Sequence, residues 1–277
     1  MKRWILNGMI VIFALVFLAS AYFLADYYLK SRRQKRTFNQ LATIMHQSAA
    51  QSRLERSDTS DITADPSEPT GPVLAEATDP ETGETVLMLP EFVDLYEMNN
   101  DIVGWIAIEN TPINYPVMQK PEYTDYYLYL DFNKAYSRHG SIYVREACDV
   151  FSPSDNVTIY GHRMGDGTMF NALHNYVDEP FYQEHRFITF NTLTENHIYE
   201  IMAVFRISSS ADNPFQYHLF VDAEDAAQFD EYVYNCSSRS LYNTGVTASY
   251  GDKLITLSTC EYTNVNGRLV VVAKRIY

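Results

Sequence analysis

The hydrophobic residues of this chain begin with a continuous apolar run at the N-terminus. From Trp4 to Ala25 no residue is charged. As a helix this run would extend about 33 Å, enough to cross a hydrocarbon core of about 30 Å. The alternative is a cleaved signal peptide with a small-residue cleavage site at residues 19–21. Because the apolar run continues past that site, we favour a retained transmembrane anchor over residues 1–29.

Two polar segments follow the apolar run. Residues 30–57 begin with a basic cluster and then place Phe38, Leu41 and Met45 at helical spacing, which predicts a juxtamembrane helix. Residues 58–88 are rich in Asp, Glu, Pro, Ser and Thr and contain no Lys or Arg. A segment of that composition buries too little apolar surface to offset the entropy lost on ordering. We therefore expect a flexible acidic linker over residues 58–88.

Short apolar segments with strand character fill the remaining residues, 89–277, after a short helix at their start. Alternation with period two and β-branched residues predict strands at 102–108, 113–117, 140–144, 157–160, 186–190, 197–207, 253–257 and 269–273. Helical insertions are expected at 168–176 and at 222–236, the second with Asp222 as its N-cap. Many short strands with few helices favour a single mainly β domain, a closed or partly closed barrel.

Composition excludes some classes of function. The chain has 277 residues with 22 Tyr and 15 Phe, which is enough apolar material for a substantial core. Its formal net charge is −14, which argues against a nucleic-acid partner, because phosphates require a basic surface. Histidine, cysteine and carboxylate spacings typical of metal sites do not occur in the sequence, so we expect no metal site.

The three cysteines differ in their surroundings. Cys236 falls on the apolar face of a predicted helix, which indicates a small core residue. Cys148 lies in a polar turn, and the sequence gives neither a role for it nor support for a Cys148–Cys236 disulfide. Cys260 ends an apolar strand and begins a polar loop, a position that exposes a thiol on a rigid element. The alternative for Cys260 is a cysteine packed at the end of a strand.

A cysteine nucleophile needs a partner that accepts its proton, and histidine most often serves. His162 follows a predicted strand and a glycine that permits a sharp turn, so it is also delivered at a strand exit. Arg268 opens the strand after Cys260 and could stabilise the oxyanion that forms in acyl transfer; its alternative is a surface ion pair. The remaining histidines are most simply surface or hydrogen-bonded residues: His46, His139, His174, His185, His197 and His218.

These residues together resemble the sortases, and most closely class B. The resemblance rests on TLSTC at 256–260, an Arg eight residues later leading into LVVVAKR, and IYGHRM at 159–164. The stretch DIVGWIAIENTPINYPVMQ at 101–119 and the long helical insert at 222–236 are also similar. The resemblance implies a sortase-type eight-stranded β-barrel over 89–277, with an N-terminal helix and helical insertions, preceded by the transmembrane helix and linker.

The resemblance also implies roles for individual residues. Cys260 would be the nucleophile and His162 the general acid and base, while Arg268 would position the substrate and stabilise the oxyanion. The backbone N–H of Glu261 would be a second oxyanion donor. Tyr262 stands where class B members often have an acid. No cofactor is implied, and two further residues, Ser258 and Thr259, join the expected oxyanion and substrate-binding set.

The implied function is that of a membrane-anchored cysteine transpeptidase of a Gram-positive-type cell. It would cleave the C-terminal sorting signal of a surface protein, typically Asn-Pro-x-Thr in class B, through a thioester. An amine of the cell-wall peptide would then accept the protein. The alternatives are a sortase that polymerises pilins through a pilin lysine, a cysteine protease, and a non-catalytic surface binding module.

The family implies a single-pass membrane protein with its catalytic domain outside the cell. Lys2 and Arg3 precede the apolar run, whereas five basic residues follow it between 30 and 36. Taken alone, that charge distribution would place the C-terminal side in the cytoplasm. The acidic linker and the location of surface-protein substrates favour the exported orientation, with the lipid bilayer as partner of the N-terminal helix.

Overall fold

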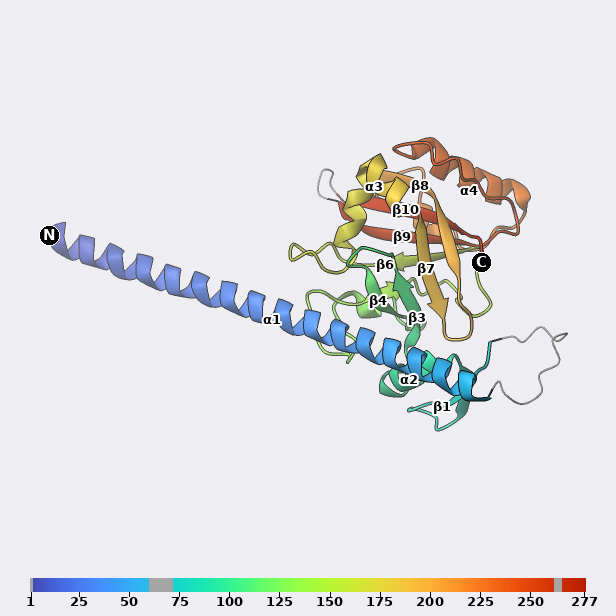
Figure 1. Cartoon of the computed structure of the whole chain (residues 1–277). Helices are drawn as coiled ribbons and strands as arrows, with labels where there is room; N and C mark the ends of the chain where they lie inside the picture. The colour runs from blue at the N-terminus through green and yellow to red at the C-terminus, as the bar shows by residue number, and fades with distance from the viewer. Residues whose placement is uncertain (1, 60–71, 262–265) are drawn as a thin grey trace. The chain divides into compact units, whose positions relative to one another are not determined.

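The computed structural model describes residues 2–59, 72–261 and 266–277, in two compact units, Met1–Gln40 and Leu41–Tyr277 (Figure 1). Helix α1 (Lys2–Thr59) begins in the first unit and ends in the second. Among the described residues, α1 contains the one segment, Arg3–Ser52, that is long and apolar enough to cross a membrane. A signal sequence near the N-terminus meets the same test.

Eight strands of the second unit form a closed barrel (Figure 1). Neighbours around the barrel follow the order β10-β8-β7-β3-β4-β5-β6-β9. The pairs β4–β5 and β6–β9 are parallel, and the other pairs are antiparallel. The strands are β3 (Ile102–Ala107), β4 (Asn114–Met118), β5 (Ile142–Val144), β6 (Asn156–Tyr160), β7 (Phe187–Thr192), β8 (Ile198–Ser208), β9 (Leu254–Glu261) and β10 (Gly267–Arg275).

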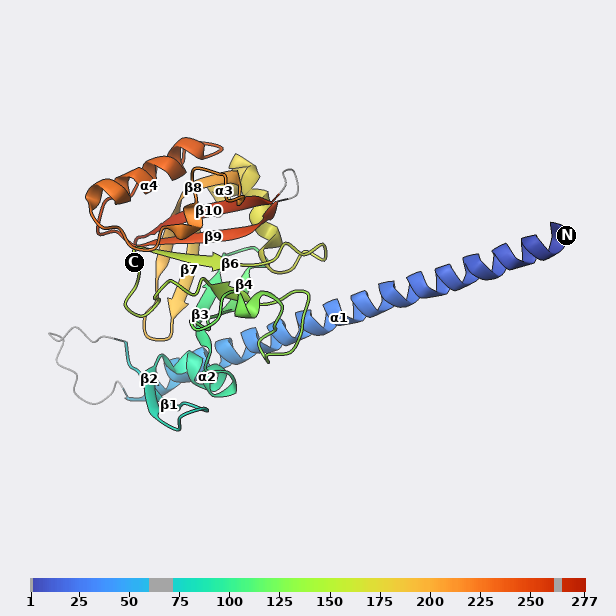
Figure 2. The same cartoon turned by 180° about the vertical axis from the view of Figure 1, so that it is seen from behind.

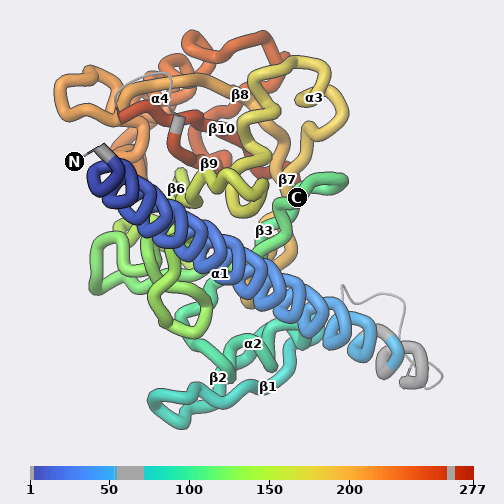
Figure 3. The backbone as a smooth tube through the Cα atoms, turned by 90° about the vertical axis from the view of Figure 1, so that its left-hand side faces the viewer, coloured from blue at the N-terminus to red at the C-terminus, as the bar shows by residue number. Residues whose placement is uncertain are grey.

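The structure differs from the sequence prediction at the end of the acidic segment. Residues expected to belong to a flexible linker form the hairpin of β1 (Ala75–Thr78) and β2 (Thr85–Met88), beside α2 (Val93–Met98) (Figure 3). Asp79 accepts hydrogen bonds in the turn from the backbone N–H groups of Glu81 and Thr82, and from the Tyr96 hydroxyl at 2.7 Å. Asp79 therefore stabilises a turn. The average composition does not show this role, because it counts Asp79 only as one more acidic residue. Residues 60–71 of the predicted linker lie outside the described part.

Helix α4 (Ala226–Arg239) covers the outer surface of the barrel at β8 and β10 (Figure 2). Its buried face carries Phe229, Val233 and Cys236, as the helical spacing predicts, and also Tyr232. Ala226, which the spacing places on the same face, is exposed. The predicted N-cap is wrong, because Asp225 accepts the hydrogen bond from the Gln228 backbone N–H at 2.9 Å. Asp222 instead accepts from the backbone N–H of Asp155, a residue distant in sequence.

Short helices complete the second unit. The insertion expected at 168–176 is a 3-10 helix, η3, followed directly by α3. Leu41 and Met45, whose spacing predicts a helix, lie in α1, and their side chains are buried. The bounds of the remaining helices are η1 (Pro90–Phe92), η2 (Tyr126–Leu128), η3 (Phe170–Val177), α3 (Glu179–Glu184) and η4 (Tyr217–Leu219).

Candidate active site

The antiparallel pair β9–β10 brings Cys260 and Arg268 together. The two residues are direct cross-strand partners in the register, so their side chains emerge on the same face of the sheet. Arg268 Nη1 donates to the carbonyl of its neighbour Gly267 at 3.0 Å. Cys260 is partly exposed. The sequence predicts a thiol and a guanidinium at matching ends of neighbouring strands, and the structure has this arrangement.

The face of β9 that carries Cys260 is covered along the rest of its length. Side chains alternate along a strand, so Thr256 and Ser258 share the face of Cys260. The Tyr232 hydroxyl of α4 lies 3.0 Å from Thr256 Oγ1, and the Tyr217 hydroxyl of η4 lies 2.7 Å from Ser258 Oγ. The candidate site therefore begins at Cys260, where the cover provided by Tyr232 and Tyr217 ends.

His162 reaches the same point from the other side of β9. Strand β6 runs parallel to β9, and the backbone N–H of Gly161 donates to the Ser258 carbonyl at 3.2 Å. A Cβ atom at Gly161 would lie 2.5 Å from Ile142 Cδ1 and 2.7 Å from the Phe170 ring. Glycine therefore permits the close approach at which β6 ends and His162 begins the next segment.

The imidazole of His162 is held by the segment at 128–129. Its Nε2 lies 2.7 Å from the carbonyl oxygen of Leu128, and its ring centroid is 5.5 Å from that of Tyr129. A carbonyl can only accept a hydrogen bond, so Nε2 carries a proton whether the ring is neutral or charged. The atom of His162 that gains and loses a proton is therefore Nδ1.

Electrostatics favour the neutral form of His162. Burial lowers the pKa of His162 below its ordinary value of 6.5, and Coulombic interactions with His139 and Arg268 lower this pKa further. The hydrogen bond to Leu128 acts in the opposite direction and does not cancel these effects. An imidazole that is neutral near pH 7 is able to accept a proton from a thiol.

One cavity of about 330 Å³ is lined by all three of these residues. Residues from η2, β5, β6 and η4, together with Asp125 just before η2, complete its wall, and several of them are aromatic or polar. They include Asp125, Tyr143, Tyr160, Tyr217 and His218. The Asp125 carboxylate accepts a hydrogen bond from the Tyr143 hydroxyl at 2.7 Å. A cavity of this kind, with a thiol, an imidazole and a guanidinium at its edge, has the components for acyl transfer.

The other expected residues lie at or near the cavity. Ser258 and Thr259 line it, and both are buried. The Ser258 hydroxyl is paired with Tyr217, whereas Thr259 Oγ1 has no hydrogen-bond partner among the described residues. Glu261 ends β9 opposite Gly267. Tyr262 lies outside the described residues.

Two histidines that the sequence left as ordinary residues contact this site. His174 Nε2 lies 2.9 Å from the carbonyl oxygen of Cys260 and donates to it. His218 lines the cavity, and burial lowers its pKa, with Arg145 and Arg268 acting in the same direction. Neither residue has a local motif, because each meets Cys260 or its cavity only through the tertiary fold. No signal within their own segments separates them from the remaining histidines.

The other two cysteines are buried and free. Cys148 Sγ lies 3.5 Å from the carbonyl oxygen of Asn156 and from the backbone nitrogen of Thr158. Burial raises the pKa of both thiols, that of Cys236 to about 12. All three cysteines belong to the described residues, so Cys260 is the one with an accessible thiol.

Comparison with known proteins identifies the family. A family model described as the sortase domain matches residues 106–276. The chain belongs to the sortase family. The sortase B of Staphylococcus aureus is 34% identical over 189 residues, covering 68% of this sortase and 75% of the relative. The sortase B of Listeria monocytogenes is 32% identical over 188 residues, covering 67% and 74%.

Solved structures agree with the sequence relatives. A structure of a Staphylococcus aureus sortase B–substrate complex superposes with a TM-score of 0.68 at 26% identity, covering 90% of this sortase and 98% of that chain. The predicted class B resemblance and eight-stranded barrel are therefore confirmed. This sortase is a cysteine transpeptidase of the sortase B family, whose activity anchors surface proteins.

Proposed function

We propose that this sortase attaches a surface protein to an amine of the cell-wall peptide, with Cys260, His162 and Arg268 as its catalytic residues. The strongest support is that a single cavity of about 330 Å³ is lined by all three side chains. The substrate would be a C-terminal sorting signal of the Asn-Pro-x-Thr type that class B sortases typically take. A surface protein bearing that signal and the amine acceptor are the two partners.

In the first half of the reaction the signal is cleaved. Nδ1 of His162 takes the thiol proton of Cys260, and the thiolate attacks the carbonyl carbon of the threonine. The guanidinium of Arg268 and the backbone N–H of Glu261 donate to the oxyanion. As the tetrahedral intermediate collapses, Nδ1 returns the proton to the departing amine, and the threonine carbonyl remains bonded to sulfur as a thioester.

In the second half an amine replaces sulfur. The uncharged amine attacks the thioester carbon, and Nδ1 of His162 accepts a proton from the attacking nitrogen. The oxyanion again faces Arg268. Collapse releases the Cys260 thiolate and leaves a new amide bond. Transfer of the proton from Nδ1 to sulfur restores the resting enzyme.

The placement of the enzyme is part of the proposal. Residues 1–29 would be a retained single-pass transmembrane anchor, and residues 30–57 the helical segment that follows it. The catalytic domain would then lie outside the cell, where surface proteins and cell-wall peptides meet. The long apolar helix α1 supports an anchor by its length and composition.

Product analysis with the full-length protein in detergent tests the proposal. The protein is incubated with an Asn-Pro-x-Thr peptide alone, with a glycine peptide, and with a peptide carrying a lysine side chain, and products are identified by mass spectrometry. We expect cleavage after threonine and amide products with an added amine. Cleavage that yields only the hydrolysed peptide under all conditions would identify a protease, and an uncleaved peptide would contradict the proposed substrate.

A further inference from the structure

A small hairpin beside His162 presents two tyrosines to solvent. The backbone N–H of Ser137 donates to the Tyr129 carbonyl at 2.9 Å, and Leu130 and Tyr136 form an isolated bridge. The rings of Tyr129 and Tyr136 are stacked, with centroids 6.3 Å apart and planes inclined at 27°. Tyr136 is 74% exposed and Tyr129 is 49% exposed. We call these two residues the tyrosine platform.

The tyrosine platform is continuous with the catalytic imidazole. Tyr129 lies between Tyr136 and His162, and its ring is inclined at 32° to the imidazole. Neither tyrosine lines the cavity that holds the thiol and the guanidinium, although the adjacent Leu128 does. The platform therefore leads from solvent to His162 along a different surface from the cavity wall.

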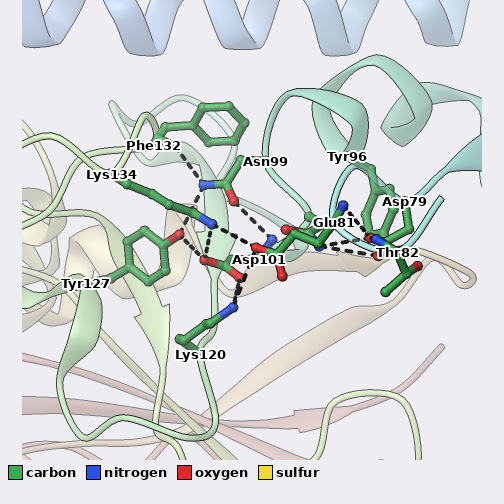
Figure 4. A network of polar contacts seen from close by, with 11 residues as sticks. Asp79, Glu81, Thr82, Tyr96, Asn99, Asp101, Lys120, Tyr127, Phe132 and Lys134 are labelled. Carbon is green, nitrogen blue, oxygen red and sulfur yellow. Dashed lines mark hydrogen bonds and ion pairs between the residues drawn. The ribbon is translucent and has the colours of Figure 1, made fainter.

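Buried contacts fix the hairpin that carries the platform (Figure 4). Phe132 is buried, and its carbonyl accepts a hydrogen bond from Asn99 Nδ2 at 2.7 Å. Lys134 at the hairpin turn forms an ion pair with the buried Asp101 at 3.0 Å. The Tyr127 hydroxyl also donates to Asp101, at 2.6 Å. Buried contacts thus hold the hairpin that carries the two exposed rings. A surface held in this way loses little conformational entropy when it binds a ligand.

We propose that the tyrosine platform binds the acceptor, through its primary ammonium group and the chain that bears it, before the thioester is attacked. This inference rests on the proposed function. Amines of peptides and lysine side chains are largely protonated near neutral pH, and the faces of tyrosine rings attract such cations. The ammonium group must lose one proton before it can attack the thioester, and Tyr129 of the platform lies beside His162, the residue that accepts protons in the reaction. Exposed aromatic rings at this position therefore suit a cationic acceptor.

The test measures how the thioester is divided between water and amine. Full-length Tyr136→Ala, Tyr136→Phe and Tyr123→Ala proteins are compared with the wild type in detergent. Tyr123 is a matched control, since it is 58% exposed and packs against Tyr126 rather than Tyr129. Each protein receives the sorting peptide with increasing glycine peptide, with increasing lysine-bearing peptide, or with hydroxylamine, which is uncharged at neutral pH.

We expect Tyr136→Ala to raise the KM for a cationic acceptor about two- to five-fold, in line with an exposed cation–π contact. Hydrolysis without amine and the reaction with hydroxylamine should be unchanged. Tyr136→Phe retains a ring and should behave like the wild type, as should Tyr123→Ala. The acceptor whose KM rises more, the glycine amine or the lysine amine, identifies the source of the ammonium group.

An unchanged KM for both cationic acceptors in Tyr136→Ala would overturn the inference. An equal loss of hydrolysis, hydroxylamine reaction and aminolysis would also overturn it, because it would assign Tyr136 to folding or to binding of the sorting peptide. A wild-type enzyme that forms no thioester would overturn the proposed function itself, and this inference with it. The two failures are thus distinguishable in one experiment.

Discussion

Cys260 and Arg268 lie opposite each other across β9 and β10, as direct partners in an antiparallel register. This relationship explains why the two residues are only eight positions apart in the sequence. A short connection between antiparallel strands returns the chain to the same end of the sheet, and cross-strand partners project on the same face. The thiol and the guanidinium are thereby fixed to one rigid pair of strands, whereas His162 lies just after the end of the parallel neighbour β6.

Replacement of Arg268 by lysine should lower kcat/KM by about two to three orders of magnitude, the usual effect of losing an oxyanion donor. The ammonium group is compact and cannot reproduce the planar fork of guanidinium. Steady-state cleavage of the sorting peptide measures the effect, and thermal unfolding checks the fold. Wild-type turnover by Arg268→Lys would assign Arg268 a structural role.

Gly161→Ala should reduce both activity and stability. The new Cβ would meet the Ile142 and Phe170 side chains at 2.5 and 2.7 Å, and relieving that overlap would displace the start of the His162 segment. Overpacking of this kind costs about 1–3 kcal/mol in the free energy of unfolding. Gly165→Ala is the matched control, because a Cβ there meets nothing within 4 Å. Equal behaviour of the two variants in urea unfolding and peptide cleavage would contradict the account.

The pKa of His162 should lie below 6.5 in the folded protein. Burial is the main cause, and Arg268 contributes. Nuclear magnetic resonance titration of labelled histidine, with His162→Ala to assign the signal, measures this pKa directly. Arg268→Gln removes a positive charge and should raise the pKa, while burial keeps it below 6.5. The acid limb of the kcat/KM profile should have its midpoint below pH 6.5 as well. A titration at or above 6.5 in the wild type would refute this.

Asp101 should be a major contributor to stability. Although burial by itself raises the pKa of Asp101, hydrogen bonds from Tyr127, Lys120 and Lys134 outweigh it and lower that pKa below its ordinary value. Breaking a buried ion pair costs about 3–5 kcal/mol, so Asp101→Ala should lower the free energy of unfolding by that amount at pH 7. The partly exposed pair of Asp252 and Lys274 offers a control, and Asp252→Asn should cost less than about 1 kcal/mol.

The ion pairs of Asp101 with Lys120 and Lys134 also predict that the free energy of unfolding depends on pH. A carboxylate with a lowered pKa stabilises the folded state above its unfolded pKa of about 3.9, and this stabilisation is lost as the pH falls through the folded pKa. The difference in urea stability between wild type and Asp101→Ala should therefore be full at pH 7 and smaller at pH 3. A difference that does not shrink with acid would show that charge is not its cause.

The eight strands could be predicted from sequence because alternation and β-branched residues mark each strand locally. The hairpin β1–β2 could not, since its signal is a turn aspartate, Asp79, within a segment whose average composition resembles a linker. The N-cap of α4 was misplaced because Asp222 and Asp225 are both acceptable caps, and only the contact of Asp222 with Asp155 decides between them.

In the candidate site, too, some residues could be predicted from local sequence patterns, whereas others are brought together only by the tertiary fold. Cys260 and His162 stand near the exits of strands and Arg268 stands near the start of one, and the ends of strands are visible in the sequence. The contacts of His174 with Cys260 and of Leu128 with His162 join segments 86 and 34 residues apart. No periodicity or motif reports such contacts, because they depend on how the barrel closes. The role of Leu128 is also carried by its backbone carbonyl, for which the side chain gives no signal.

The most direct test of the central claim is to trap the acyl-enzyme and locate it. Full-length protein is mixed with an Asn-Pro-x-Thr peptide, quenched in acid, and analysed by intact mass and peptide mapping. We predict one thioester adduct, on Cys260, that is absent in Cys260→Ala, retained in Cys236→Ala, and formed far more slowly in His162→Ala. An adduct on another residue, or peptide cleavage by Cys260→Ala at the wild-type rate, would contradict the claim.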